Sequence, residues 1–211
     1  MGAPDTLHTL EGSHVRLEPL QMRHVDALLA AAQGGAELFH WTTVPAERAA
    51  MARYVEAAVR ARDAGTAMPF ATVRRADGVV VGSSRFFDIA RWAWPPSHPR
   101  AQAAADNCEI GYTWLSPAAI RSAVNTEAKY LMLRHAFESW EACGVCFHTD
   151  ARNERSCTAL AGIGAKFEGI LRAHRLAADL APRDSARYSI TAAEWPALSE
   201  HLLARLAPRR G

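Results

Sequence analysis

The segment from Glu109 to Ala151 constrains the fold most, because it places one long helix between two short apolar strands. Alternation in the first strand, which ends at Leu115, predicts Ile110, Tyr112 and Trp114 on one face and Glu109, Gly111 and Thr113 on the other. Asn125 is expected to cap the helix and Gly144 to stop it. Its apolar face consists of Met132, Leu133, Ala136, Phe137 and Trp140. With a second strand at 145–151, this order predicts a right-handed crossover between near or adjacent parallel strands.

The rest of the chain adds strands and helices around this unit. Strands are expected at 15–20, 70–74, 79–87, 166–176 and 187–190, and helices at 22–33, 46–63 and 154–163. Asp77 and Gly78 support the positive φ angles of a hairpin turn between two of these strands. No linker, repeat or low-complexity stretch divides the sequence. We therefore predict an α/β fold with a mixed sheet in a single domain, residues 1–211, with an inserted loop at 88–107.

Composition argues against several classes of function. Lys and Arg total 24 against 22 Asp and Glu, so the net charge of +2 provides no broad cationic field for nucleic acid. No window approaches 18 uncharged apolar residues, and the N-terminus lacks the pattern of a secretory signal. We therefore expect a cytoplasmic protein that has neither a nucleic-acid nor a membrane partner.

The cysteines and histidines do not have the spacing of a metal site. Cys143 and Cys146 form a lone C-x-x-C without a second ligand pair, and the four cysteines are expected to be reduced. His135, His148 and His174 also lack the spacing of metal ligands. We predict no metal and assign these side chains to packing or to the surface.

The connection from Leu115 to Asn125 is a candidate phosphate site. It joins a strand to a helix, so backbone N–H groups and the positive end of the helix dipole converge there. An ordinary capped connection has the same features, so both interpretations stay open on this signal alone.

Two longer stretches resemble the acetyl-coenzyme A (acetyl-CoA) site of GNAT acetyltransferases of the RimJ/RimL type: EIGYTWLSPAAIRSAVNTEAKYLMLRHAFE and TDARNERSCTALAGIGAKFEGILR. The N-terminal run EGSHVRLEPLQMRHVDALLAAA is also similar to the opening strand and helix of that family. The resemblance implies a GNAT fold with splayed parallel strands and helices on both faces of the sheet. It further implies that main chain near Trp114 and Leu115 pairs with the pantetheine arm, and that the pyrophosphate is held by amides of Ile120, Arg121, Ser122, Ala123, Val124 and Asn125.

This loop departs from the family pattern at two places. The family usually has Gln-Arg-x-Gly-x-Gly/Asn, whereas this chain has Ile120 in place of the Gln and Ala123 in place of the first Gly. A glycine lets phosphate approach the backbone closely, so these changes could reduce the affinity for the coenzyme.

Three residues are candidates for the chemistry. The resemblance implies that Asn153 contacts the coenzyme arm and that Ser156 protonates the departing thiolate. Alternatively, Asn153 caps a short helix and Ser156 bonds within its first turn. Glu109 is the best-placed carboxylate to accept a proton from an acceptor ammonium, directly or through water, although it could also be a plain surface glutamate. Glu127, in the first helical turn, is explained by the helix dipole.

We therefore predict an acyltransferase that moves an acetyl group from acetyl-CoA to a primary amine by direct attack on the thioester. The acceptor could be a protein N-terminus or a small-molecule amine, and the protein a monomer or a homodimer. Two other classes stay open: a non-catalytic acyl-CoA sensor, and an interaction protein that binds no coenzyme. In the inserted loop, Trp92 and Trp94 are expected to pack on the domain surface, on a second subunit or around the acceptor.

Overall fold

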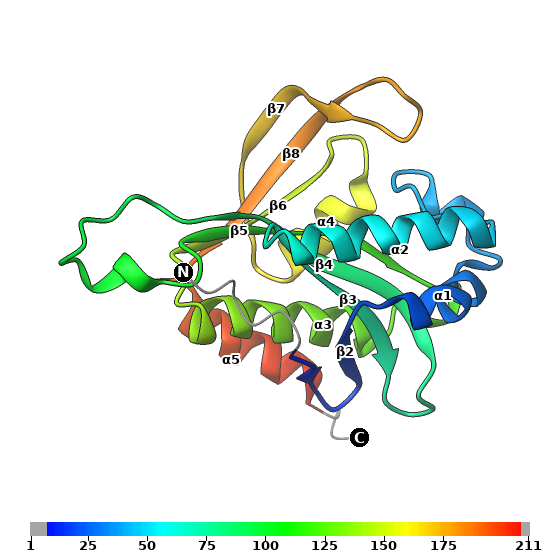
Figure 1. The fold of residues 1–211 in the computed structure, drawn as a ribbon, viewed down its shortest axis with the longest axis horizontal. Helices are drawn as coiled ribbons and strands as arrows, with labels where there is room; N and C mark the ends of the chain where they lie inside the picture. Colours follow the sequence, from blue (N-terminus) through cyan, green and yellow to red (C-terminus); the bar gives the residue numbers. More distant parts are fainter. Residues whose placement is uncertain (1–7, 208–211) are drawn as a thin grey trace.

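An eight-stranded sheet forms the centre of the molecule in the computed structural model, which describes residues 8–207 (Figure 1). Its strands are β1 (Leu10–Glu11), β2 (Val15–Pro19), β3 (Ala67–Arg74), β4 (Val80–Ala90), β5 (Asn107–Leu115), β6 (Gly144–Asp150), β7 (Lys166–Leu176) and β8 (Pro182–Thr191). Their order is β1-β2-β3-β4-β5-β6-β8-β7. Only β5 and β6 pair in parallel, and the other neighbours among the described strands are antiparallel. The predicted mixed α/β sheet is confirmed.

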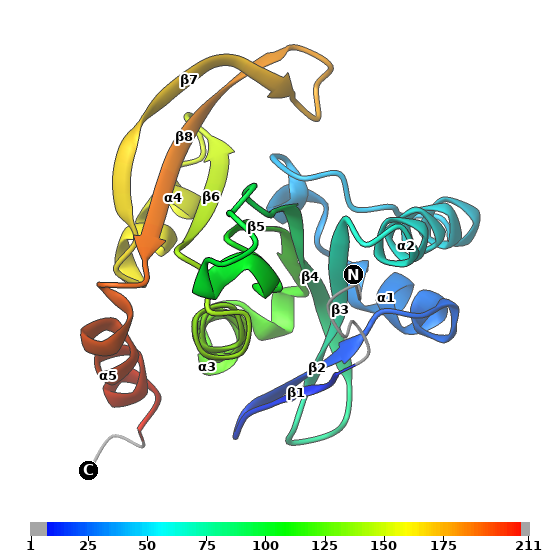
Figure 2. The ribbon, with the colours of Figure 1, turned by 60° about the vertical axis from the view of Figure 1, so that its left-hand side comes forward.

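Helices cover both faces of this sheet (Figure 2). The helices α1 (Val25–Ala32), which follows the turn η1 (Met22–His24), and α2 (Arg48–Asp63) form one core with Ala71 and Trp114. A larger core is contributed by α3 (Ala123–Arg134), its π-helical continuation η5 (His135–Ser139), α4 (Glu154–Gly162) and α5 (Trp195–Leu206). Three short 3-10 turns, η2 (Ala36–Phe39), η3 (Pro99–Gln102) and η4 (Pro117–Ala119), lie in connections. Among residues 8–207, no helix has the length and apolar character to cross a bilayer.

The two parallel strands pair over a short distance only. Residues 107–109 of β5 lie in register with residues 144–146 of β6, and no further pair joins these two strands. β5 nevertheless continues to Leu115 and β6 to Asp150. The strands therefore part just beyond Glu109, as the splay expected from the sequence requires.

An extra residue in β5 changes the faces that its side chains occupy. Ser83 of β4 pairs with Trp114, whereas Arg85 pairs with Gly111, and Tyr112 has a φ of 50°. This β-bulge breaks the alternation of side chains. Ile110 and Trp114 consequently belong to different cores, and Tyr112 is 51% exposed. The prediction that these three side chains share one face was therefore wrong.

Both predicted ends of the central helix also need correction. The Ser122 hydroxyl accepts a hydrogen bond from the backbone N–H of Val124 at 3.3 Å, so Ser122 caps α3 and Asn125 lies within its first turn. At the other end, the helical segment finishes at Ser139, and Gly144 is the first residue of β6. Serine and asparagine cap helices about equally well, so composition alone could not choose between them.

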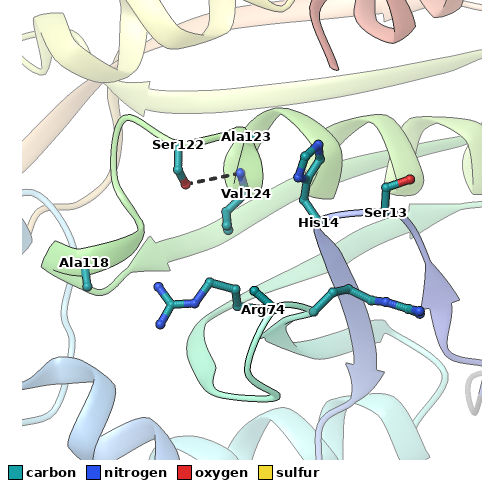
Figure 3. A pocket seen from close by; sticks show the side chains of 9 residues that line it. Ser13, His14, Arg74, Ala118, Ser122, Ala123 and Val124 are labelled. Carbon is teal, nitrogen blue, oxygen red and sulfur yellow. Dashed lines mark hydrogen bonds between the residues drawn. The ribbon is translucent and has the colours of Figure 1, made fainter. Parts of the chain in front are cut away.

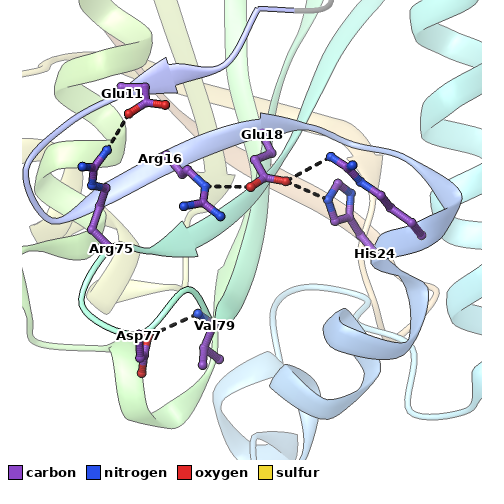
Figure 4. Close-up of polar contacts among 8 residues, drawn as sticks. Glu11, Arg16, Glu18, His24, Arg75, Asp77 and Val79 are labelled. Atoms are coloured by element: carbon purple, nitrogen blue, oxygen red, sulfur yellow. Dashed lines mark hydrogen bonds and ion pairs between the residues drawn. The ribbon is translucent and has the colours of Figure 1, made fainter.

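Ion pairs and hydrogen bonds connect the N-terminal strands β1 and β2 to neighbouring residues. Glu18 of β2 accepts hydrogen bonds from Arg16 at 2.7 Å and lies 3.2 Å from His24, and Arg75 pairs with Glu11 (Figure 4). At the β3–β4 turn in the same view, Asp77 accepts a hydrogen bond from the Val79 N–H, and Gly78 has the expected positive φ of 71°.

A buried glutamate ties the turn between β1 and β2 to α3. The carboxylate of Glu127 accepts hydrogen bonds from the backbone N–H groups of Ser13, His14 and Val15, at 2.8, 2.5 and 2.7 Å. Glu127 is thus structural, as expected, but it lies beyond the first turn of α3, so its role is to satisfy these three donors rather than to complement the helix dipole.

Candidate active site

A cleft of about 820 Å³ opens where β5 and β6 part. Its walls come from β5, the connection to α3, β6, the first turns of α4 and the β7–β8 hairpin. Most of the residues predicted from the sequence line it: Glu109, Trp114, Leu115, Ile120, Arg121, Asn125, Asn153 and Ser156. The fold therefore brings the candidate phosphate loop and the candidate catalytic residues into one cavity.

The turn before α3 provides unpaired N–H groups, of which that of Arg121 belongs to the cleft and those of Ser122 and Ala123 to a neighbouring hollow. Arg121 has a φ of 58°, a left-handed conformation in the turn before the helix. Within residues 8–207, the backbone N–H groups of Arg121, Ser122 and Ala123 donate no hydrogen bond. Free N–H groups at such a turn, at the positive end of a helix, are suited to bind an anion.

The six predicted phosphate-loop residues divide between two hollows. Ile120, Arg121 and Asn125 line the cleft, whereas Ser122, Ala123 and Val124 line a separate hollow of about 420 Å³. The second hollow lies against Ser13, His14, Arg74 and Arg75 (Figure 3). Both of its arginines are already paired, Arg74 with Asp77 and Arg75 with Glu11. The turn before α3 therefore separates the two hollows, and a ligand in the cleft would meet only part of the predicted set.

Asn153 and Ser156 lie at the opposite wall, at the start of α4. The Asn153 Oδ1 accepts a hydrogen bond from the Ser156 N–H at 3.1 Å, so Asn153 is the cap of this helix. The Ser156 hydroxyl makes no hydrogen bond to the part of the chain that the structure describes. The capping role of Asn153 is thus present, and the serine hydroxyl is available to a ligand in the cleft.

Glu109 lies at the inner end of the cleft with two partners. Its carboxylate accepts hydrogen bonds from Arg175 of β7 at 2.8 and 3.1 Å, and the His148 Nδ1 of β6 is 2.9 Å from its Oε2. The residue is only 2% exposed, so it is not the surface glutamate considered above. Burial alone would raise the pKa of Glu109, but the short contact with His148 and the hydrogen bonds and positive charge of Arg175 lower it overall.

Sequence reasoning missed the group that Glu109 forms with Cys146 and His148. One potential ligand atom from each of these residues lies within 4.8 Å of the others, a separation at which a metal could be held. Two features oppose this use: Arg175 already occupies both oxygens of Glu109, and burial together with the Glu109 charge raises the pKa of Cys146 to about 11. The three residues come from two strands, so their meeting depends on the β5–β6 register rather than on a spacing in the sequence.

A buried lysine also lines the cleft. The Nζ of Lys129 donates hydrogen bonds to the hydroxyls of Thr113 at 2.6 Å and Ser84 at 3.3 Å. The structure gives it no carboxylate partner among residues 8–207, and burial lowers the pKa of Lys129 to about 7. The sequence did carry a signal for the burial of Lys129: it precedes Met132 and Leu133 by three and four residues, which places it on the apolar face of the helix.

Trp92 and Trp94 do not line the cleft. Their loop joins β4 to β5 and is organised by Asp106, which is 1% exposed. Asp106 accepts hydrogen bonds from the Trp92 N–H at 2.7 Å, from the Trp94 indole at 2.9 Å and from Arg100. The irregular part is 91–106, shorter than the predicted 88–107, because β4 extends to Ala90 and β5 begins at Asn107. The loop projects from the body of the molecule (Figure 1).

Comparisons with known proteins agree with this architecture. The model of the acetyltransferase (GNAT) domain matches residues 14–166. A GCN5-related N-acetyltransferase from Brucella melitensis is 30% identical, with a TM-score of 0.84 over 98% of this chain and 88% of that chain. An acetyltransferase from T. thermophilus is 34% identical, with a TM-score of 0.76 over 95% and 97%. RimJ from Mycobacterium smegmatis, solved with CoA-disulfide, shares the fold at 22% identity, with a TM-score of 0.75 over 95% and 92%. A search of curated proteins gives no match.

Proposed function

Because this chain belongs to the GNAT family of acetyltransferases, we propose that it transfers the acetyl group of acetyl-CoA to a primary amine. The donor and the class of enzyme, an acyltransferase, follow from the family. The amine acceptor is supported by one observation above all: a buried carboxylate, Glu109, lies beside an imidazole at the inner end of the cleft. An acceptor ammonium must lose its proton before it can attack, and such a centre can accept one.

We assign the end of the cleft beside α3 to the coenzyme. The free N–H group of Arg121, which lines the cleft, supports binding of the pyrophosphate there, and the main chain near Trp114 and Leu115 is the proposed partner of the pantetheine arm. Asn153 and Ser156 line the same cleft at the start of α4 and are proposed to contact this arm. The unused hydroxyl of Ser156 supports its role as the donor of a proton to the thiolate.

The proposed transfer proceeds in one displacement. The neutral amine nitrogen attacks the thioester carbonyl carbon, a C–N bond forms, and the C–S bond breaks. The proton lost by the ammonium goes to the Glu109 centre, and Ser156 protonates the sulfur. The second proton, which the attacking nitrogen loses as the amide forms, replaces the one given by Ser156. Main-chain N–H groups near the β5 bulge are the proposed donors to the carbonyl oxygen. The acceptor range is that expected from the sequence, a protein N-terminus or a small-molecule amine.

Thiol release tests this function. Purified protein is incubated with acetyl-CoA and pools of amines that include peptides with free N-termini, and free CoA thiol and acetylated product are measured together. We expect amine-dependent thiol release with one acetylated product per thiol. Binding of acetyl-CoA without release for any pool would instead favour a non-catalytic sensor, and no binding would favour an interaction protein.

A further inference from the structure

The imidazole of His148 has no hydrogen bond in the described structure although it is almost fully buried. Its side chain is 5% exposed, and neither Nδ1 nor Nε2 has a hydrogen-bond partner among residues 8–207. The Nδ1 lies 2.9 Å from the Glu109 Oε2, a contact that is short but not aligned as a hydrogen bond. Buried polar nitrogens usually have a partner, and the Glu109 carboxylate is the group that lies nearest to Nδ1.

His148 also faces the cleft in which the acceptor would lie. It lines the cavity together with Glu109 and Arg175. A neutral imidazole has one N–H and one free lone pair. Nδ1 is the ring nitrogen nearer to Glu109, at 2.9 Å from its Oε2, and in the tautomer that carries its hydrogen on Nδ1 the lone pair on Nε2 is left to accept a proton.

Arg175 makes Glu109 unsuited to hold the proton itself. Its guanidinium donates to both carboxylate oxygens, and a second carboxylate, Asp88 of β4, lies 3.0 Å from the same guanidinium. Protonation of Glu109 would weaken these charge-assisted bonds. A proton on His148, by contrast, would place a cation beside the Glu109 carboxylate, so the pair gains rather than loses an attraction.

The charged groups around His148 are compatible with a protonated imidazole. The titratable and charged groups that face it are Glu109 of β5, Cys146 of β6, His174 and Arg175 of β7, and Arg187 of β8, which pairs with His148 across the sheet. Arg187 is itself paired with Glu168 at 2.6 Å, and Arg175 with Glu109 and Asp88. Burial raises the pKa of the Cys146 thiol to about 11, so it adds no charge near neutral pH. Glu109 is then the nearest counter-ion for a protonated His148.

We propose that His148 takes the proton from the acceptor ammonium, and that Glu109, held by Arg175, is a positioning residue that orients the imidazole and stabilises the imidazolium. This inference rests on the proposed function and refines it. The surrounding atoms cover Nε2, so its lone pair accepts one proton from the ammonium through a water molecule. The neutral amine then attacks the acetyl carbon as the C–S bond breaks, and the second proton of the nitrogen is released as the amide forms. The proton leaves His148 to solvent before the next turnover.

The test compares the pH dependence of kcat/KM in three forms: wild type, His148→Gln and the matched control His174→Gln. The ring of His174 lies 4.7 Å from that of His148, but no ion pair joins it to Glu109. With an alkylamine acceptor, we expect His148→Gln to lose about 100-fold in kcat/KM at pH 7 and to lose the acid limb of its pH profile, while His174→Gln keeps that limb. An aromatic amine, which is already neutral at pH 7, should restore most of the activity of His148→Gln. Thermal unfolding first confirms that both variants fold.

Two further results decide the inference. In a double-mutant cycle, Glu109→Gln and His148→Gln should lose less kcat/KM together than the sum of their separate losses, and additive losses would overturn the coupling. Thiol release by His148→Gln with the wild-type pH profile, or an equal loss for alkyl and aromatic amines, would overturn the inference alone. Failure of the wild type to release thiol with every amine would overturn the proposed function and this inference together.

Discussion

Three charged residues of the interior are stabilised in different ways. Glu127 accepts three backbone N–H groups, Glu109 is paired with Arg175, and Lys129 has only two hydroxyl partners. A buried charge needs a counter-ion or several hydrogen bonds. Lys129 is thus the group of the three whose charged form is least well supported, and its protonation should influence stability near neutral pH.

Substitution of Lys129 by methionine tests this directly. The pKa of Lys129 is lowered by burial to about 7 in the folded protein, from an ordinary value of 10.5. Between these values the unfolded chain binds one more proton, so the stability of the wild type should rise with pH by about 1.4 kcal/mol per unit at most. Below pH 7 both states are protonated, so the stability should level off at its lower value. Lys129→Met should lack this slope in urea denaturation from pH 6.5 to 10.

The chain offers a matched control for that measurement. Its other lysine, Lys166, is exposed and paired with Glu194. Lys166→Met should keep the pH slope of the wild type. Equal slopes for wild type and Lys129→Met would show that Lys129 stays charged in the folded protein.

The hydroxyl of Ser156 can also be tested by a single substitution. Its hydroxyl is unbonded within the described chain and lines the cleft, so Ser156→Ala removes the proposed proton donor without breaking the Asn153 cap, which uses the backbone N–H. We expect kcat to fall by about 10-fold, less than typical for general acid catalysis, because a thiolate is a fair leaving group and water can replace the donor. Steady-state kinetics with both substrates checks this. A change confined to the KM for acetyl-CoA would make Ser156 a binding residue.

Most elements could be predicted from the sequence because each has a strong local pattern. The hairpin at Gly78, α2 and the strand–helix–strand unit from β5 to β6 all carry apolar periodicity and turn residues. The β5 bulge at Tyr112 could not be predicted, since it arises from how β5 pairs with β4. β1, of two residues, is too short to give a pattern. The sequence reasoning also missed α5, although Trp195, Leu198 and Leu202 have helical spacing.

At the scale of elements, Glu127→Gln should detach the β1–β2 turn from α3. An amide offers one acceptor oxygen to a site with three N–H donors at 2.8, 2.5 and 2.7 Å, and its NH2 group would oppose them. We expect a loss of about 2 kcal/mol in the free energy of unfolding, measured by urea denaturation. Glu56→Gln is the control, because Glu56 is an exposed partner of Arg60 on α2 and should change stability by less than about 0.5 kcal/mol. Equal effects of the two substitutions would contradict the anchoring role of Glu127.

At the scale of the whole molecule, the position of the cleft could be predicted from the sequence, but the residues around Glu109 could not. The resemblance and the strand–helix connection pointed to the cleft that Trp114, Arg121 and Ser156 line. The partners of Glu109 were not predicted, because Arg175 is 66 residues away and reaches it from the β7–β8 hairpin. Contacts of this kind depend on the order β6-β8-β7, which no local pattern specifies.

The same topology predicts how the donor should affect the fold. The first five strands join the last three through three residue pairs of β5 and β6, and on the α3 face Trp195 of α5 donates a hydrogen bond to Glu138 at 3.0 Å. The proposed coenzyme would contact Arg121, which follows the first five strands, and Ser156 of α4, which lies among the last three. It would thus join the two halves of the molecule across the cleft. Binding of acetyl-CoA to the folded state should therefore raise the free energy of unfolding by about 2.7 kcal/mol at a coenzyme concentration of 100 times Kd. Tm should rise with the coenzyme concentration accordingly.

Hydrogen exchange distinguishes this bridging from simple binding. With acetyl-CoA, amides should gain protection both in the turn at residues 120–125 and in the first turn of α4, because the ligand would hold the two walls together. AMP, which lacks the pantetheine arm, serves as the control and should protect at most one wall. A Tm that does not move at millimolar acetyl-CoA would exclude the proposed site. A raised Tm with protection on one wall only would mean that the coenzyme stabilises a single half, and that contacts within the protein, among them the β5–β6 pairs and the Arg175–Glu109 pair, hold the halves in place.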